Sequence, residues 1–173
     1  MGSTAKGIVY PNPGDQPRRL AFETLATTAD TAIGNEVSAS VSLLGLWANF
    51  TPTWTASTTN PTLGNGTLTG RYVQIGKTVR FSIAVTFGST TNIGSGAYTF
   101  SLPVAAATVQ QFPVGGARLR DNSAPAYNMR TTYLLGSTTV AVASESGLNM
   151  GHNNPWTWAV SDLINISGTY EAA

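Results

Sequence analysis

Residues 64–102 have the sequence GNGTLTGRYVQIGKTVRFSIAVTFGSTTNIGSGAYTFSL, and this stretch decides the fold. In its middle, apolar residues at every second position alternate with small or polar ones; the apolar set is Val79, Phe81, Ile83, Val85 and Phe87. Successive side chains of a strand point to opposite faces, so this pattern predicts a half-buried antiparallel strand. Its partner is expected at residues 67–75, with a turn at Gly76 and Lys77. We therefore expect a β-sheet core, with any function on the surface or edges of the sheet.

Short strand patterns separated by turn residues continue through the rest of the chain. Further strands are expected at residues 50–55, 97–102, 117–121, 126–134, 138–143, 156–160 and 164–170. Turn signals such as Gly115-Gly116 and Asn153-Asn154-Pro155 separate them. Eight or nine short strands in about 125 residues predict a mainly β protein with a jelly-roll or β-sandwich head over residues 46–173.

Residues 1–45 differ from the head and are expected to form an extended arm followed by a short helix. Within residues 1–16, two prolines and three glycines surround a short apolar patch made of Ile8, Val9, Tyr10 and Pro11. So short a run cannot form a core of its own. We interpret it as a docking arm that needs the surface of another protein to bury its apolar side chains.

The helix is expected over residues 18–33, which lack Gly and Pro, and is expected to end at Gly34. A narrow apolar stripe recurs at three- and four-residue steps and consists of Phe22, Leu25, Ala29 and Ile33. A second stripe after Gly34 allows a continuation. The threonines between these positions are poor helix formers, so the helix is expected to depend on partners. A helix packed on its own domain and a short oligomerisation stalk fit about equally well, and a homotrimer would bury the stripe.

Composition argues against several classes of function. Only 10% of the residues are charged, the net charge is +1, and there is no cysteine. We therefore expect neither a nucleic-acid partner nor a thiolate metal site. No apolar run approaches the length of a membrane span, and the N-terminus lacks the apolar region of a secretory signal. Arg118 and Arg120 would share one face of a strand, where they are expected to line an edge or an interface.

Groups suited to catalysis are scarce. His152 is the only histidine and lies in a loop-like stretch, and four carboxylates are scattered through the head. A triad of His152 and Asp162 with a serine is formally open, but a solvated loop histidine is about ten times more plausible. We expect no enzyme activity, no cofactor and no metal.

Aromatic residues near the C-terminus are candidates for a sugar contact. Trp156 and Trp158 would share a face of a strand, and the amides of Asn153 and Asn154 beside them suit sugar hydroxyls. Packing in the core or at an interface is the more common role of such residues. We keep these four residues as candidates for a glycan contact.

Two segments also resemble parts of known proteins. The opening Lys6-Gly7-Ile8-Val9-Tyr10-Pro11, with the Leu- and Ala-containing helix after it, is similar to the leader of minor tail and fibre proteins of tailed phages. Residues 51–55 (TPTWT), 64–72 (GNGTLTGRY) and 75–79 (IGKTV) resemble a β-domain of virion surface proteins of phages of actinobacteria.

The resemblance implies a structural protein of the virion surface, with no catalytic residues. In this interpretation the arm docks on another virion protein, the helix trimerises and the head faces outward, with possible partners among host-surface glycans. The main expectation is a minor tail or short fibre protein. The alternatives are a capsid decoration protein that clamps neighbouring capsid subunits and, less favoured, a cell-wall glycan hydrolase.

Overall fold

The computed structural model describes residues 16–43, 45–107, 112–145 and 149–173. The contacts divide the chain into two units, Met1–Leu44 and Gly45–Ala173, which are described separately below. The predicted docking residues Ile8, Val9, Tyr10 and Pro11 lie outside the described part of the chain.

The described part of the first unit is one helix, α1, which spans Gln16–Leu43. Gly34 does not end it, so the predicted stop at this residue is wrong. A glycine costs a helix only about 1 kcal/mol relative to alanine, and two good helix formers, Ala32 and Glu36, lie two residues away on either side. The side chains of residues 24–37 are exposed to solvent. Within the described residues, no helix is both long enough and apolar enough to cross a membrane.

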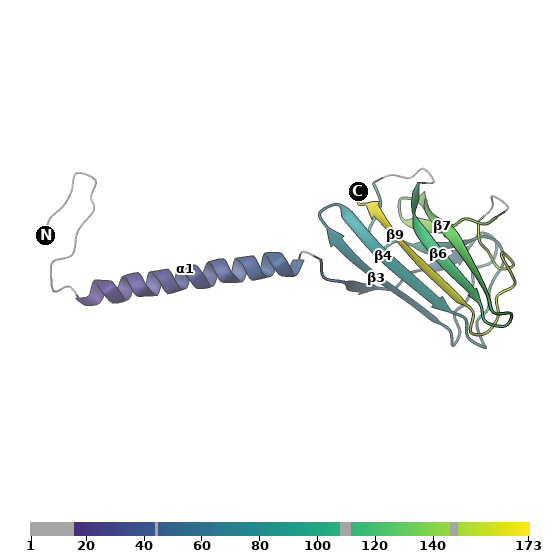
Figure 1. Cartoon of the computed structure of the whole chain (residues 1–173), viewed down its shortest axis with the longest axis horizontal. Helices are drawn as coiled ribbons and strands as arrows, with labels where there is room; N and C mark the ends of the chain where they lie inside the picture. Colours follow the sequence, from purple (N-terminus) through teal and green to yellow (C-terminus); the bar gives the residue numbers. More distant parts are fainter. Residues whose placement is uncertain (1–15, 44, 108–111, 146–148) are drawn as a thin grey trace. The chain divides into compact units, whose positions relative to one another are not determined.

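The second unit, which we call the head, is an antiparallel β-structure, as expected. Its described strands are β1 (Ala48–Phe50), β2 (Trp54–Ala56), β3 (Thr67–Ile75), β4 (Thr78–Thr86), β5 (Tyr98–Ser101), β6 (Pro113–Asp121), β7 (Ala126–Gly136), β8 (Thr139–Val142) and β9 (Leu163–Glu171). They form one sheet in the order β1-β3-β4-β9-β6-β7-β8-β5-β2. Figure 1 shows β3, β4, β9, β6 and β7 side by side. The mainly β prediction is confirmed, but the strand predicted at residues 156–160 is wrong, because this segment has a bend at Trp156, a turn at Val160 and no strand between them.

The sheet curls so that strands from its two ends share one core. Trp54 of β2, at one edge of the sheet, packs edge-on against Phe87, which follows β4, at 5.5 Å between ring centroids. The alternating apolar residues of β4 are fully buried in this core, as their spacing predicts. Burying each large apolar side chain contributes roughly 1.5–3 kcal/mol, so β4 is a main source of the stability of the head.

The Gly64-Asn65-Gly66 turn is tied to the loop after β4. The Asn65 side chain accepts hydrogen bonds from the Thr90 amide (2.9 Å) and hydroxyl (3.0 Å), and it donates to the Ser89 hydroxyl (3.0 Å). Gly64 has a φ of +57°, and a Cβ there would lie 2.3 Å from the carbonyl oxygen of Thr90. Glycine is therefore required at this position both for its conformation and for the close approach of the two loops.

Candidate functional site

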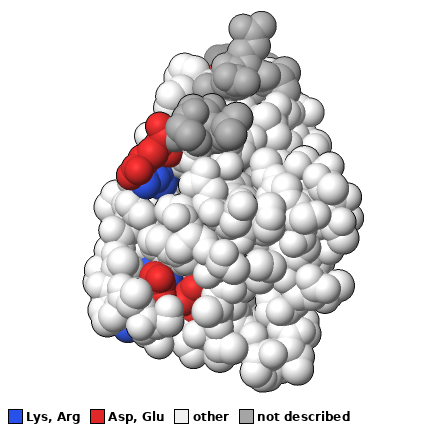
Figure 2. Space-filling model, turned by 90° about the vertical axis from the view of Figure 1, so that its right-hand side faces the viewer, with Lys and Arg blue, Asp and Glu red and all other residues white. Residues whose placement is uncertain are grey.

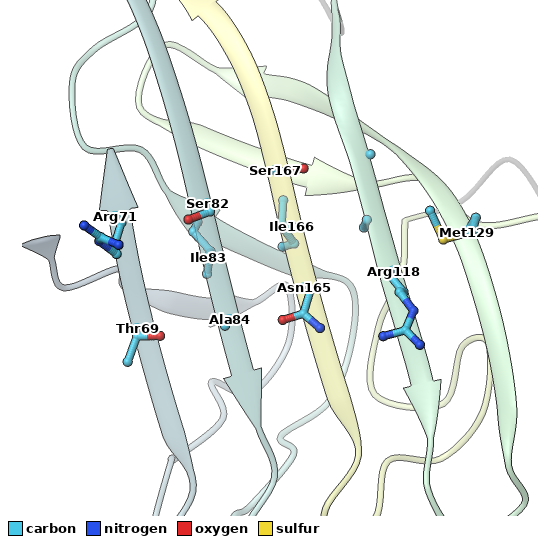
Figure 3. A pocket seen from close by; sticks show the side chains of 12 residues that line it. Thr69, Arg71, Ser82, Ile83, Ala84, Arg118, Met129, Asn165, Ile166 and Ser167 are labelled. Carbon is cyan, nitrogen blue, oxygen red and sulfur yellow. The ribbon is translucent and has the colours of Figure 1, made fainter. Parts of the chain in front are cut away.

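An open hollow of about 470 Å³ lies on the outward face of the sheet, over β3, β4, β9, β6 and β7. Figure 3 shows its side chains rising from these neighbouring strands. We call this hollow the outer-sheet groove. It is a concavity of the head that could receive a ligand, and no sequence pattern pointed to it.

The pairing of the strands explains the shape of the groove. One row across the sheet runs Arg71–Ser82–Ser167–Gly116, and the next runs Thr69–Ala84–Asn165–Arg118–Met129. Small side chains therefore meet in the middle of the face, while long ones stand on the outer strands. In Figure 3, Arg71 lies on one side and Arg118 and Met129 lie on the other. The hollow follows directly from residue size at paired positions.

Both flanking arginines stack on aromatic rings. The guanidinium carbon of Arg118 lies 4.5 Å from the centre of the Tyr127 ring, and that of Arg71 lies 5.6 Å from the centre of the Trp47 ring. Stacking of this kind holds a guanidinium in place and leaves its N–H edges free to donate. Neither arginine forms an ion pair with any residue in the described part of the chain. Both charges are thus placed beside the groove without a carboxylate partner.

The outward face as a whole carries an excess of positive charge. Across β3, β4, β9, β6 and β7, all of them described, the outward positions hold Arg71, Arg80, Arg118 and Arg120 but only one acid, Glu171. By contrast, the face of the molecule in Figure 2 is mostly uncharged, and its charged side chains lie in two small groups in which acids and cations occur together. The weak net charge of the chain therefore conceals a local cationic surface.

The other acids of the head have structural tasks. Asp162 is buried, and its two carboxylate oxygens accept hydrogen bonds from the amides of Asn122 and Ala159, both at 2.8 Å. Asp121 holds the β6–β7 turn. The hydroxyl of Ser123, followed by the amide of Ala124, keeps the pKa of Asp121 below its usual value. These carboxylates stabilise loops and turns.

Glu145 has a different partner, since it forms an ion pair with Arg130. Of the four carboxylates in the head, only Glu171 is left without a hydrogen-bond or ion-pair partner among the described residues.

His152 is tied to a neighbouring loop. Its Nδ1 accepts a hydrogen bond from the amide of Gly96 at 3.0 Å, which places the proton of a neutral ring on Nε2. Asp162 is bound to other amides, so no hydrogen bond joins the two groups that a triad would require. Within the described residues, no group of three His, Cys, Asp or Glu side chains could hold a metal ion.

The residues predicted to contact a glycan differ in their exposure to solvent. Trp158 is only 4% exposed, stacks on Phe87 at 5.0 Å, and donates from Nε1 to the carbonyl of Gly151. Its ring is part of the core and is not available as a sugar platform. Trp156 is half-buried against Trp158, Asn153 is exposed, and Asn154 is partly exposed.

The predicted oligomerisation residues are largely at the surface of α1. Leu25 and Ile33 are 65% and 62% exposed, and Ala29 is exposed as well. The side chain of Phe22 lies outside the described part. The exposed stripe leaves these apolar side chains without a covering surface in the described chain.

Comparison with known proteins gives no relative: no family model, curated protein or solved structure matches this chain.

Proposed function

We propose that this chain is a non-enzymatic structural protein of a phage virion, a short trimeric appendage that docks by its N-terminal arm and presents the β head outward. The observation that carries the proposal is the exposed apolar stripe of α1. Leu25, Ile33 and Val37 are 65%, 62% and 56% exposed. At about 100° per residue they fall within an arc of about 120°, together with Ala29, which is the width of a face that packs against other helices.

Self-association is the simplest way to cover this stripe. An isolated helix without packing is marginally stable, and the threonines of α1 lower its propensity further. Thr28, which borders the stripe, donates its hydroxyl to the carbonyl of Thr24, so this group is already satisfied beside the apolar seam. Three copies around a three-fold axis would bury the stripe with one equivalent face per chain.

The head is better suited to presenting a binding surface than to catalysing a reaction. We propose that its curled sheet forms a two-layer, jelly-roll-like sandwich, with the outward face free to touch another surface. His152 and Asp162 are each bound to backbone amides, which supports a structural task for both. The resemblance of residues 6–11, 51–55, 64–72 and 75–79 to phage virion proteins supports the location.

Matched charge substitutions on two faces of α1 test the proposal. Leu25→Lys with Ile33→Lys places two cations in the stripe, whereas Thr27→Lys with Thr31→Lys adds the same charge on the opposite face. Light scattering coupled to size exclusion should show a trimer for the wild type and the threonine variant, and a monomer for the stripe variant. A monomeric wild type, or equal behaviour of the two variants, would contradict the proposal.

Antibody labelling of purified particles tests the location. We expect label at the tail. Label spread over the capsid would favour a capsid decoration protein over a tail appendage. Particles without label would contradict a role in the virion.

A further inference from the structure

We infer that the outer-sheet groove binds an anionic polysaccharide, a chain in which carboxylate groups recur among hydroxyls. This inference rests on the proposed outward display of the head and gives the head a partner class. It places the contact on β3, β4, β9, β6 and β7, away from the tryptophan loop suggested by the sequence.

Charge complementarity points to an anion. Arg71 and Arg118 flank the groove, each stacked on a ring and each without a carboxylate partner in the described chain. A guanidinium donates two parallel hydrogen bonds to a carboxylate, and stacking fixes the plane from which it donates. Arg80 and Arg120 extend the positive charge along the same face.

The separation of the two arginines favours an extended chain over a single small anion. Three strand-to-strand steps and an offset of two residues put their Cα atoms about 16 Å apart, given about 4.8 Å per strand and about 3.4 Å per residue. One carboxylate cannot lie against both guanidiniums when they stay on their rings. A polymer with repeated carboxylates reaches both.

The floor of the groove favours a sugar between the charges. Ser82, Ser167 and Asn165 line it, and their side chains make no hydrogen bond within the described part of the chain. Hydroxyl and amide groups both donate and accept, which matches sugar hydroxyls. DNA fits less well, since its sugar-phosphate backbone offers acceptors only, and the rings of Tyr127 and Trp47 on which bases could stack each have an arginine over them.

A second copy of the head is a poor occupant. Two such faces would bring like charges together, and a different face of the head has few free acids to offer. Asp162 and Asp121 bind amides of their own loops, and Glu145 is paired with Arg130. Among the described residues of the head, Glu171 is the one side-chain carboxylate without a partner.

The test measures binding of the full-length protein to polygalacturonate, with neutral dextran as the control polymer. We expect binding to polygalacturonate alone, weakening as salt rises. Arg71→Gln with Arg118→Gln should weaken it tenfold or more. Lys77→Gln with Arg130→Gln removes the same charge at described residues that do not line the groove, and should change binding less than twofold. Equal loss in both double variants, or equal binding of dextran, would overturn the inference.

A variant that fills the groove separates shape from charge. Ala84 lies outward on β4 among the small residues of the floor, so Ala84→Phe should weaken binding at least tenfold without altering the net charge. Circular dichroism checks that each variant is folded; if Ala84→Phe unfolds, Ser82→Val takes its place. Unchanged binding in the folded groove variant would overturn the inference, as would stronger binding of single-stranded DNA than of polygalacturonate.

The stripe variant of α1 distinguishes this inference from the proposed function. Each Leu25→Lys/Ile33→Lys chain should keep its groove and bind polygalacturonate with the wild-type affinity per site. Retained binding by a wild-type protein that proves monomeric would support the groove while rejecting the trimer. Loss of binding in a trimeric, folded Arg71→Gln/Arg118→Gln variant would support both.

Discussion

Phe81 in the head is fully buried, whereas Leu25 in α1 is 65% exposed, although both lie in segments with a regular apolar period. In the head, the curled sheet brings the apolar face of β4 against side chains from distant strands. In α1, the described stripe lies on a helix whose side chains from residue 24 to residue 37 all face solvent. The comparison teaches that the head contains its own core, whereas the described part of α1 leaves its apolar stripe exposed, and this is the stripe that the proposed trimer would bury.

The largest expected difference between the two regions concerns truncation of one apolar side chain. Phe81→Ala removes a ring that packs against Tyr170 at 5.8 Å between centroids, and should lower the free energy of unfolding of the head by about 3–5 kcal/mol. Leu25→Ala should leave that free energy unchanged and shift only the oligomer equilibrium. Urea unfolding monitored by tryptophan fluorescence measures the first effect. A large loss of head stability in Leu25→Ala would break the comparison.

A smaller loss is expected when a loop tie is cut inside the head. Asn65→Ala removes the hydrogen bonds to Ser89 and Thr90 and should cost about 1–3 kcal/mol, since each bond contributes about 1 kcal/mol. Asn35→Ala on α1 is the matched control, because its position lies on an exposed part of the helix. Thermal unfolding should show a lower Tm for the head in Asn65→Ala only. Equal Tm values would mean that the turn is not held by this side chain.

The smallest effect is a pH dependence confined to the head. Burial raises the pKa of Tyr170 to about 12, and its hydroxyl donates to the carbonyl of Val104 at 2.6 Å. In the unfolded chain the Tyr170 phenol ionises near pH 10. The contribution of the buried, neutral phenol to stability is therefore complete below pH 10 and is lost as pH rises toward 12. Tyr170→Phe should flatten the decline in Tm over that range. An unchanged decline in this variant would assign it to other groups.

The sequence was sufficient where structure depends on neighbouring residues. The alternation over residues 67–75 and 78–86 and the Gly76-Lys77 turn defined β3 and β4, because period and turn chemistry are local. The predicted helix end at Gly34 also rested on a local preference, and there it failed. The tendency of glycine to end a helix was weaker than the tendency of the segments on both sides to form one continuous helix. The alternation of tryptophans placed Trp158 on the surface of a strand. In the structure its segment is not a strand, and its ring is buried in the core.

The groove depends on pairing that no local pattern specifies. β9 lies between β4 and β6, so Asn165 and Ser167 join Ser82 and Arg118 although they are far apart in the sequence. Spacing did predict that Arg118 and Arg120 share a face. It did not reveal that Arg71 lies on the same face across two intervening strands, and this is the information that turns separate arginines into a site.

Sedimentation velocity of the full-length chain beside a chain of residues 45–173 tests the central claim most directly. The account predicts that the full-length protein sediments at three times the 18.0 kDa of one chain, while the shortened protein is a folded monomer. A monomeric full-length protein would contradict it, and so would a head that forms the same oligomer without α1.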